Sequence, residues 1–194
     1  MKTITVTPEE MNRRTVRFKN LESYQVQQER ASGIPRPVLE RIAAHRVYPI
    51  MVPRTYVGRG GFAPLRGEPG LYVAIAECPP GDGPGLHAHE TTTENFLCLS
   101  GRFKIAWGDQ GEDSLVLEPL DFCSVPPGVS RSFQNISNEP ARLLVMIQIP
   151  TEEQADRVAY APQVGEQIER EFGKQTVAAL NAIGFKFDAG LEPA

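Results

Sequence analysis

Two of the three histidines in the chain lie close to a glutamate, in the segment GDGPGLHAHETTTENFLCLSG that spans residues 81–101. His87 and His89 are two positions apart, so on an extended strand both imidazoles leave the same face. Glu94 has an odd offset from His89, and the threonines between them must turn or bulge to bring its carboxylate back to that face. Two neutral imidazoles and one carboxylate form the facial triad that binds Fe(II) and related divalent metals with coordination positions left open. The segment therefore predicts a metal site formed by His87, His89 and Glu94.

Glycines at both ends of this segment complete a longer pattern. Gly81, His87, His89, Glu94 and Gly101 are spaced as G(x)5HxH(x)4E(x)6G, which resembles the first motif of the cupin family. The resemblance implies an all-β fold, the double-stranded β-helix or jelly-roll barrel, that holds a divalent metal such as Fe, Mn, Ni or Zn. Cupins include dioxygenases, decarboxylases, sugar isomerases, epimerases and proteins that only bind a ligand, so the fold does not choose among these activities.

The second cupin motif, G(x)5PxG(x)2H(x)3N, supplies a fourth metal ligand, and residues 120–135 match it only in part. Pro126, Gly128 and Asn135 are in register, whereas Leu120 replaces the leading glycine and Arg131 replaces the ligand histidine. A guanidinium stays protonated and has no lone pair for a metal, so Arg131 cannot take over the role of the imidazole. Its charge would also repel a nearby metal unless an anion lies between them, which predicts weak metal retention without a ligand.

Three hypotheses follow for a guanidinium beside two histidines and a glutamate. In the first, His87, His89, Glu94 and Arg131 form the catalytic set of a metal-dependent dioxygenase or related oxidoreductase, and Arg131 binds the anionic group of a small carboxylated substrate. In the second, Arg131 pairs with Glu94, no metal is bound, and the protein binds or isomerises an anionic or sugar-like ligand, with a histidine as proton carrier. In the third, the site is vestigial and the protein is a binding or assembly module. Whether the chain is an enzyme stays open on the sequence alone.

Strand alternation predicts further side chains in the barrel interior. Residues two and four positions after an inward-facing Glu94 or Arg131 share its face, and a third inward set belongs to the strand at 103–107. The cavity between them is expected to be largely apolar with a few polar groups, the usual composition of a small-molecule site. The candidates for substrate contact are Arg131, Phe96, Phe133, Asn135 and Trp107.

Short β-branched and aromatic runs separated by turn signals place the barrel at residues 66–150, with strands at 71–76, 96–99, 103–107, 114–117, 122–125, 131–136 and 141–149. Residues 1–65 are expected to form an arm with short helices near 8–14 and 37–45 and edge strands at 16–18, 24–26 and 47–57. Residues 151–194 are expected to form a helical tail packed on the barrel, beginning with a helix at 151–159. One structural domain results.

Charge is divided unevenly along the chain: residues 1–66 carry twelve Lys or Arg against five Glu, and the remainder carries eight against nineteen Asp or Glu. The arginines of the basic part lie among prolines and apolar residues, so packing against an acidic barrel is favoured over nucleic acid. An arm of this kind is expected to cross to a second subunit, which predicts a homodimer. No segment has the pattern of a membrane span or signal peptide, so we expect a cytoplasmic protein without a membrane partner.

Overall fold

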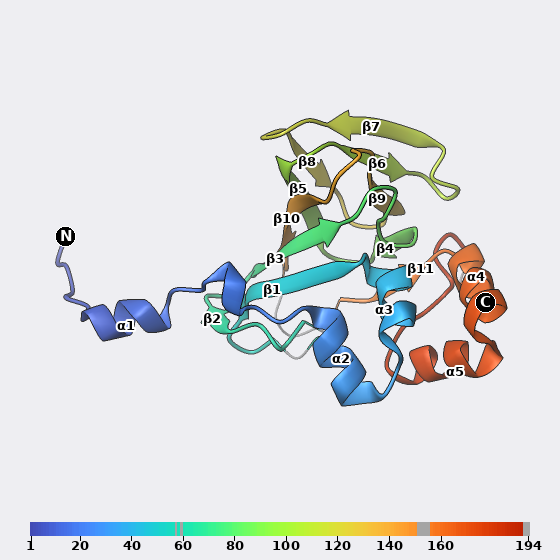
Figure 1. Cartoon of the computed structure of the whole chain (residues 1–194). Helices are drawn as coiled ribbons and strands as arrows, with labels where there is room; N and C mark the ends of the chain where they lie inside the picture. Colours follow the sequence, from blue (N-terminus) through green and yellow to red (C-terminus); the bar gives the residue numbers. More distant parts are fainter. Residues whose placement is uncertain (57, 59, 151–155, 192–194) are drawn as a thin grey trace.

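The computed structural model of the chain describes residues 1–56, 58, 60–150 and 156–191. One sheet consists of β1 (Arg46–Pro53), β2 (Leu65–Gly67), β3 (Leu71–Cys78), β5 (Thr93–Ser100), β8 (Phe122–Val125) and β10 (Ala141–Gln148). The other consists of β4 (His87–His89), β6 (Phe103–Trp107), β7 (Asp113–Leu117), β9 (Arg131–Asn135) and β11 (Val158–Tyr160). The strand orders are β2-β1-β3-β10-β5-β8 and β11-β4-β9-β6-β7, and the two sheets pack against each other (Figure 1). This is the predicted jelly-roll barrel, and each strand expected within residues 66–150 is present.

The barrel core lies between the sheets because their strands alternate inward and outward side chains. Along β3, for example, the burial pattern switches at every residue from Leu71 to Cys78. Phe96 from one sheet packs on Phe133 from the other, with ring centroids 5.4 Å apart, and Phe103 lies 6.0 Å from Phe133. The contact between Phe96 and Phe133 joins the two sheets, whereas Phe103 and Phe133 pack together on neighbouring strands of one sheet.

The first forty residues contain more helix than the sequence predicts. The helix α1 (Pro8–Arg13) begins as expected at Thr7, whose side chain and that of Glu10 form a capping box. In contrast, the strand expected at 16–18 is absent, because residues 16 and 17 form no regular element and Phe18 begins η1 (Phe18–Asn20). The helix α2 (Tyr24–Ser32) occupies the residues expected to form an edge strand at 24–26. The helix is fixed by tertiary contacts, because the buried Gln25 amide donates to the Ala44 carbonyl and accepts from the Val47 amide. Such short apolar runs do not distinguish helix from strand by pattern.

The tail also departs from the prediction. Residues 151–155 of the expected first helix lie outside the described residues, residues 156 and 157 are not helical, and residues 158–160 form β11. The helices α4 (Pro162–Phe172) and α5 (Lys174–Ala182) follow. Together with α3 (Arg36–Ala43), they bury a second apolar cluster at one end of the barrel. Arm and tail are therefore packed together, and this contact carries β11 to the edge of the sheet beside β4.

None of the helices in the described part of the chain combines the length and apolar character that crossing a bilayer requires. The cysteines are free, with Cys78 and Cys98 buried and Cys123 partly buried. Burial raises the pKa of all three thiols above its ordinary value, which disfavours the nucleophilic thiolate.

Candidate metal centre

Two strands from opposite sheets deliver the predicted ligands. The three-residue strand β4 turns both His87 and His89 into the barrel, where both side chains are buried. The chain then crosses to the other sheet, and the buried Glu94 points back from β5. The turn expected at the threonines is present, although β4 and β5 are not paired with each other. The odd offset of Glu94 is therefore resolved by a change of sheet.

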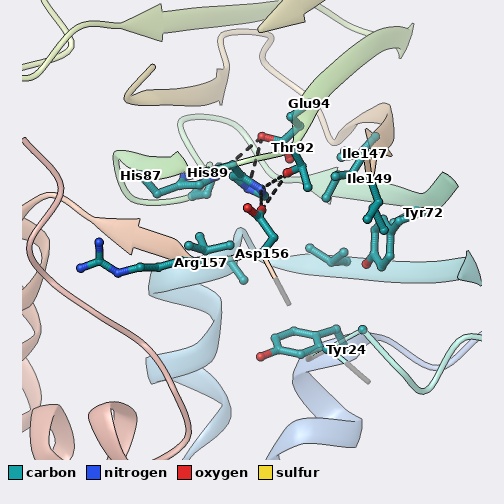
Figure 2. Close-up of a pocket in the computed structure, with 18 of the residues that line it drawn as sticks. Tyr24, Tyr72, His87, His89, Thr92, Glu94, Ile147, Ile149, Asp156 and Arg157 are labelled. Atoms are coloured by element: carbon teal, nitrogen blue, oxygen red, sulfur yellow. Dashed lines mark hydrogen bonds and ion pairs between the residues drawn. The ribbon is translucent and has the colours of Figure 1, made fainter. Parts of the chain in front are cut away.

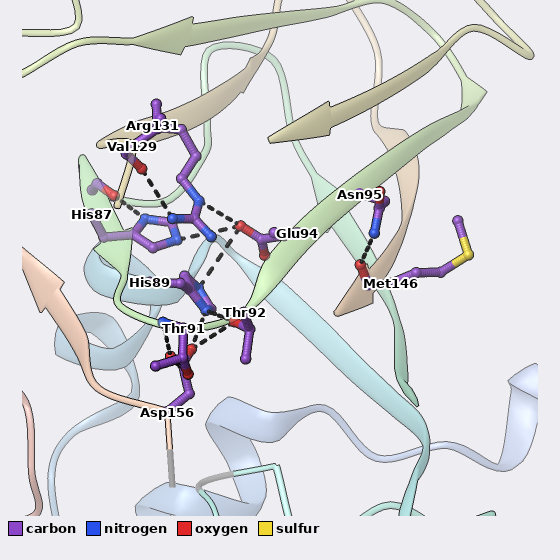
Figure 3. Close-up of polar contacts among 11 residues, drawn as sticks. His87, His89, Thr91, Thr92, Glu94, Asn95, Val129, Arg131, Met146 and Asp156 are labelled. Atoms are coloured by element: carbon purple, nitrogen blue, oxygen red, sulfur yellow. Dashed lines mark hydrogen bonds and ion pairs between the residues drawn. The ribbon is translucent and has the colours of Figure 1, made fainter. Parts of the chain in front are cut away.

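Ligand atoms of His87, His89 and Glu94 lie within 4.8 Å of one another, as the motif predicts (Figure 3). The Oε2 atom of Glu94 is 3.7 Å from Nε2 of His87 and 3.9 Å from Nε2 of His89. All three groups are buried, so water competes little for them. The three side chains therefore converge on one point from two sheets.

In each histidine, Nδ1 is the outer ring nitrogen, which points away from Glu94, and Nε2 is the inner one. The hydrogen bond of His87 Nδ1 determines the tautomer of the ring. Nδ1 lies 2.8 Å from the carbonyl oxygen of Gly85, which can only accept a hydrogen bond, so Nδ1 carries the proton. Burial lowers the pKa of His87 below its usual value, although Glu94 opposes this effect. In the resulting neutral ring, Nε2 presents its lone pair toward Glu94.

The outer nitrogen of His89 is held by a residue that the sequence analysis missed. Nδ1 lies 2.6 Å from Oδ2 of Asp156, which also accepts from the hydroxyl of Thr92 at 2.7 Å. The other oxygen of Asp156 accepts from the backbone and side chain of Thr91, both at 3.0 Å. Burial raises the pKa of Asp156, but the hydrogen bonds from His89, Thr92 and Thr91 outweigh this effect and lower it. An ionised Asp156 thus orients His89, as carboxylates behind metal-binding histidines do.

No local motif marks Asp156, because it reaches the site through pairing that is distant in the sequence. Val158 lies opposite His89 and Tyr160 opposite His87 in the ladder between β11 and β4. A three-residue strand gives too little alternation to be recognised. The only signal in the sequence is a carboxylate close to a short β-branched and aromatic run.

Arg131 lies beside His87, on the neighbouring strand β9, and pairs with Glu94. Its Nε donates to Oε2 of Glu94 at 2.9 Å, and Nη1 donates to the carbonyl of Val129 at 3.1 Å. Burial raises the pKa of Glu94, but the Arg131 charge and then His89 more than offset this effect, so the pKa lies below its usual range. The ion pair that the second hypothesis expected is present.

The guanidinium is not positioned to bind substrate directly. Arg131 has no exposed surface and does not line the cavity beside the histidines. Its Nη2 is buried and makes no hydrogen bond with the described residues. A substrate anion would reach this nitrogen only after neighbouring side chains move. The expected contact is therefore replaced by a supporting one, in which Arg131 holds Glu94.

A cavity of about 450 Å³ opens in front of the histidines and Glu94 (Figure 2). Its walls are mainly aromatic and aliphatic and come from the six-stranded sheet, from β9 and β11, and from the segment after α5. The apolar lining includes Val47, Tyr72, Ala74, Ala76, Phe133, Val145, Ile147, Ile149, Tyr160, Ile183 and Phe185. The expectation of a largely apolar cavity is confirmed.

Of the four other predicted substrate contacts, Phe133 lines this cavity, and Phe96, Asn135 and Trp107 do not. Phe96 is wholly buried behind Phe133. The Asn135 amide donates to the carbonyls of Cys78 and Glu139, so it supports the backbone. Trp107 is only partly buried at the end of β6. Alternation correctly predicts that Phe96 and Asn135 point inward, but it does not distinguish the packed part of the interior from the hollow part.

Two cationic side chains line the cavity on the side of the C-terminal tail. Arg157 and Lys186 both contribute to its lining. Arg157 is paired with Asp188 at 2.5 Å, whereas Lys186 makes no ion pair within the described residues. The backbone carbonyl of Lys186 accepts from Tyr160, which fixes its place beside β11.

A divalent metal suits this set of donors. Nδ1 of each histidine is engaged in a hydrogen bond, Nε2 of each faces Glu94, and Glu94 is ionised. Imidazole and carboxylate ligands with oriented outer nitrogens are typical of Fe, Mn, Ni and Zn sites. Asp156 also supplies a negative charge that offsets the positive charge of Arg131, which reduces the repulsion expected between metal and guanidinium.

A family model described as a cupin domain matches residues 74–147, from β3 to β10. Similar solved structures include the cupin domain of a Schizosaccharomyces pombe protein, with 20% identity over 43% of this chain and 58% of that one and a TM-score of 0.39. A putative sugar phosphate isomerase from Acidithiobacillus ferrooxidans has 24% identity over 48% of this chain and 58% of that one, with a TM-score of 0.41. A predicted oxalate decarboxylase from Thermotoga maritima has 27% identity over 40% of this chain and 65% of that one, with a TM-score of 0.37.

This chain thus spans less than two thirds of the length of each of these three proteins. No curated protein sequence matches it. The family model covers the strands that carry both histidines and Glu94, and those strands form the jelly roll expected from the motif. The match to the cupin domain model is therefore to residues 74–147, the part of the barrel that carries the histidines and Glu94.

Proposed function

We propose that the protein is a divalent-metal-dependent cupin enzyme, of the dioxygenase or a related oxidoreductase type, that acts on a small carboxylated substrate with an apolar body. The observation that carries this proposal is the convergence of His87 Nε2, His89 Nε2 and Glu94 Oε2 in a buried site, with the outer nitrogen of each histidine already engaged. Three protein ligands on one side leave positions open for substrate or oxygen.

A bound metal would supply Lewis acidity and, if redox-active, electron transfer at this point. The remaining contributions come from the chain itself. Asp156 keeps the proton of His89 on Nδ1, and Arg131 keeps Glu94 ionised and directed toward the histidines. The apolar walls exclude water from the face on which a substrate would lie, which strengthens every electrostatic interaction there.

The lining favours an apolar acid over a sugar-like ligand. A sugar needs many hydrogen-bonding partners, whereas the walls of this cavity are mostly aliphatic and aromatic. A cavity of about 450 Å³ holds a small molecule. Lys186, which lines the cavity and lacks an ion pair among the described residues, is the cation available for a carboxylate. Arg157 is the second, although it is engaged with Asp188.

A metal-free function is the alternative, and the Arg131–Glu94 pair at 2.9 Å is the observation that favours it. Here the guanidinium satisfies the carboxylate that a metal would otherwise bind. His89, with Nδ1 on Asp156, would offer Nε2 as a base to an anionic ligand in the cavity. The protein would then bind or isomerise its ligand without a metal.

Metal content and ligand binding, measured on the same samples, distinguish these functions. Because Asp156 offsets the charge of Arg131, we expect metal retention without an added anion, in contrast to the weak retention predicted from the sequence. The wild-type protein, exposed to Fe(II), Mn(II), Ni(II) and Zn(II) and then desalted, should retain one divalent ion per chain by elemental analysis. The variant His89→Ala should lose it. The matched control is His45→Ala, because His45 is the remaining histidine and lies outside the site, 3.5 Å from Glu40. Retention of metal by His89→Ala, or none in the wild type, would contradict the metal-dependent function. An unchanged affinity of His89→Ala for benzoate would then support the alternative.

A further inference from the structure

The N-terminal extension, residues 1–20, stands away from the body of the protein (Figure 1). None of the residues in α1 is buried, and residues 1–14 are all exposed. The extension is attached where Phe18 packs on Tyr48, at 4.9 Å between ring centroids, and under the guanidinium of Arg142, at 4.7 Å. A helix of six residues has marginal stability in water without tertiary contacts. Packing against another surface would therefore stabilise α1.

The extension is both apolar and basic. Exposed Met1, Ile4, Val6 and Met11 lie along it. Residues 1–20 carry five Lys or Arg against two Glu. A partner surface for such a segment needs exposed apolar side chains among acidic ones.

One region of the barrel has this character, and we name residues 109–122 the acidic edge. It contains five Asp or Glu and no Lys or Arg, and of these Glu118 is paired with Arg102 of the same chain at 2.8 Å. Its exposed apolar side chains are Leu115, Val116, Leu120 and Phe122. It includes β7 and the start of β8, which are the last strands of their sheets and so have unpaired edges within the described residues.

Leu120 gives independent evidence that the acidic edge has a partner. Its backbone is left-handed, with φ of 76°, and its side chain is 78% exposed. A leucine in this conformation is strained, because its Cβ crowds the following carbonyl group, and glycine would adopt it without strain. Because the Leu120 side chain is exposed, no burial of apolar surface offsets this backbone strain in the isolated chain. A strained and exposed apolar residue is explained if the side chain is buried against another molecule.

We propose that the N-terminal extension of one chain docks on the acidic edge of a second copy, and that two such contacts form a symmetric homodimer. The contact pairs apolar with apolar side chains and the basic residues of the extension with the carboxylates of the edge. Because each copy carries both surfaces, a two-fold axis satisfies both at once. This inference is independent of the metal site.

Charge exchange tests the contact. Sedimentation of the full chain at concentrations up to about 100 µM should show a dimer that weakens in high salt. The substitutions Arg14→Glu and Arg17→Glu together should weaken association about tenfold or more, as should Asp109→Lys with Asp113→Lys. Combining the two pairs should restore association. Glu166→Lys with Glu169→Lys, on exposed positions of α4, is the control and should have no effect.

Leu120→Gly supplies a test that misfolding cannot imitate. It should weaken association about tenfold while leaving the thermal midpoint of the dilute protein unchanged or higher, because the strain is relieved. A wild-type chain that is monomeric at every concentration overturns the proposal, as does a dimer that survives both charge reversals. An extension that folds back on its own barrel gives the monomeric result.

Discussion

Replacing Asp156 by asparagine tests the support behind His89 with almost no change of shape. All four contacts to the carboxylate come from donors: Nδ1 of His89, the hydroxyl of Thr92, and the backbone and hydroxyl of Thr91. Asparagine has one acceptor oxygen and an NH₂ group in place of the other. In either orientation the NH₂ group faces donors. If it faces His89, the ring must move its proton to Nε2, where the lone pair for a metal would be lost.

The expected size of this effect follows from the role of the carboxylate. Loss of a carboxylate behind a ligating histidine costs about 10- to 100-fold in metal affinity, or about 1.4 to 2.7 kcal/mol. The Asp156 side chain keeps 15% of its surface exposed to solvent, so we expect the lower half of this range. The assay is competition with a chromophoric chelator for Zn(II), followed by Co(II) absorption spectra to detect changed geometry.

The matched control is Asp188→Asn, which removes a carboxylate from the same tail in its ion pair with Arg157. An exposed pair contributes little, so the affinity of this variant for metal should change less than about twofold. If Asp156→Asn binds Zn(II) as tightly as the wild type, with an unchanged Co(II) spectrum, the orientation of His89 does not depend on Asp156. The reasoning about the histidine proton would then be wrong.

Three further predictions concern the charged groups of the site. Arg131→His removes one partner of a buried ion pair, so the metal-free protein should lose about 3 kcal/mol of stability in urea unfolding. The added imidazole should raise Zn(II) affinity about tenfold. Equal or weaker Zn(II) binding would contradict this. Lys186→Met should weaken binding of benzoate about tenfold and leave benzyl alcohol unaffected in calorimetry, because only the former has a charge to pair; an equal loss for both ligands would assign Lys186 a packing role. Because the pKa of His87 is lowered, the unfolded chain takes up a proton first as the pH falls through about 6.5, so the metal-free protein should be less stable at pH 5.5 than at pH 7.5. His87→Gln should reduce this dependence, and an unchanged slope would count against it.

The sequence alone predicts the positions of residues whose spacing is compatible with a single local arrangement. His87 and His89 share a strand face, and the glycine-flanked motif requires Glu94 to join them. Local spacing also predicts the inward direction of Phe96 and Phe133. It cannot tell which inward side chains fill the barrel and which border the cavity, because that depends on how far apart the sheets stand at each level.

The elements that sequence analysis missed depend on partners far along the chain. Tyr24 begins a helix because the following Gln25 hydrogen-bonds to residues about twenty positions away. The strand β11 exists because β4 has a free edge beside which Val158 can pair. Neither feature has a local period long enough to be detected. Asp156 was missed for the same reason, since its role follows from that pairing.

Asp156 also explains how the barrel accommodates an arginine at the fourth ligand position. In the cupin motif pair, three neutral imidazoles and one glutamate carry a net charge of −1 toward the metal. Here Glu94 and Asp156 contribute two negative charges, Arg131 contributes one positive charge, and His87 is neutral, so the groups around His89 again sum to −1. The exchange of histidine for arginine therefore leaves the electrostatic attraction for a divalent ion close to that of the four-ligand site, while one coordination position is removed from the protein. A site with the same charge and one fewer protein ligand leaves a further coordination position open for a substrate or a second reactant.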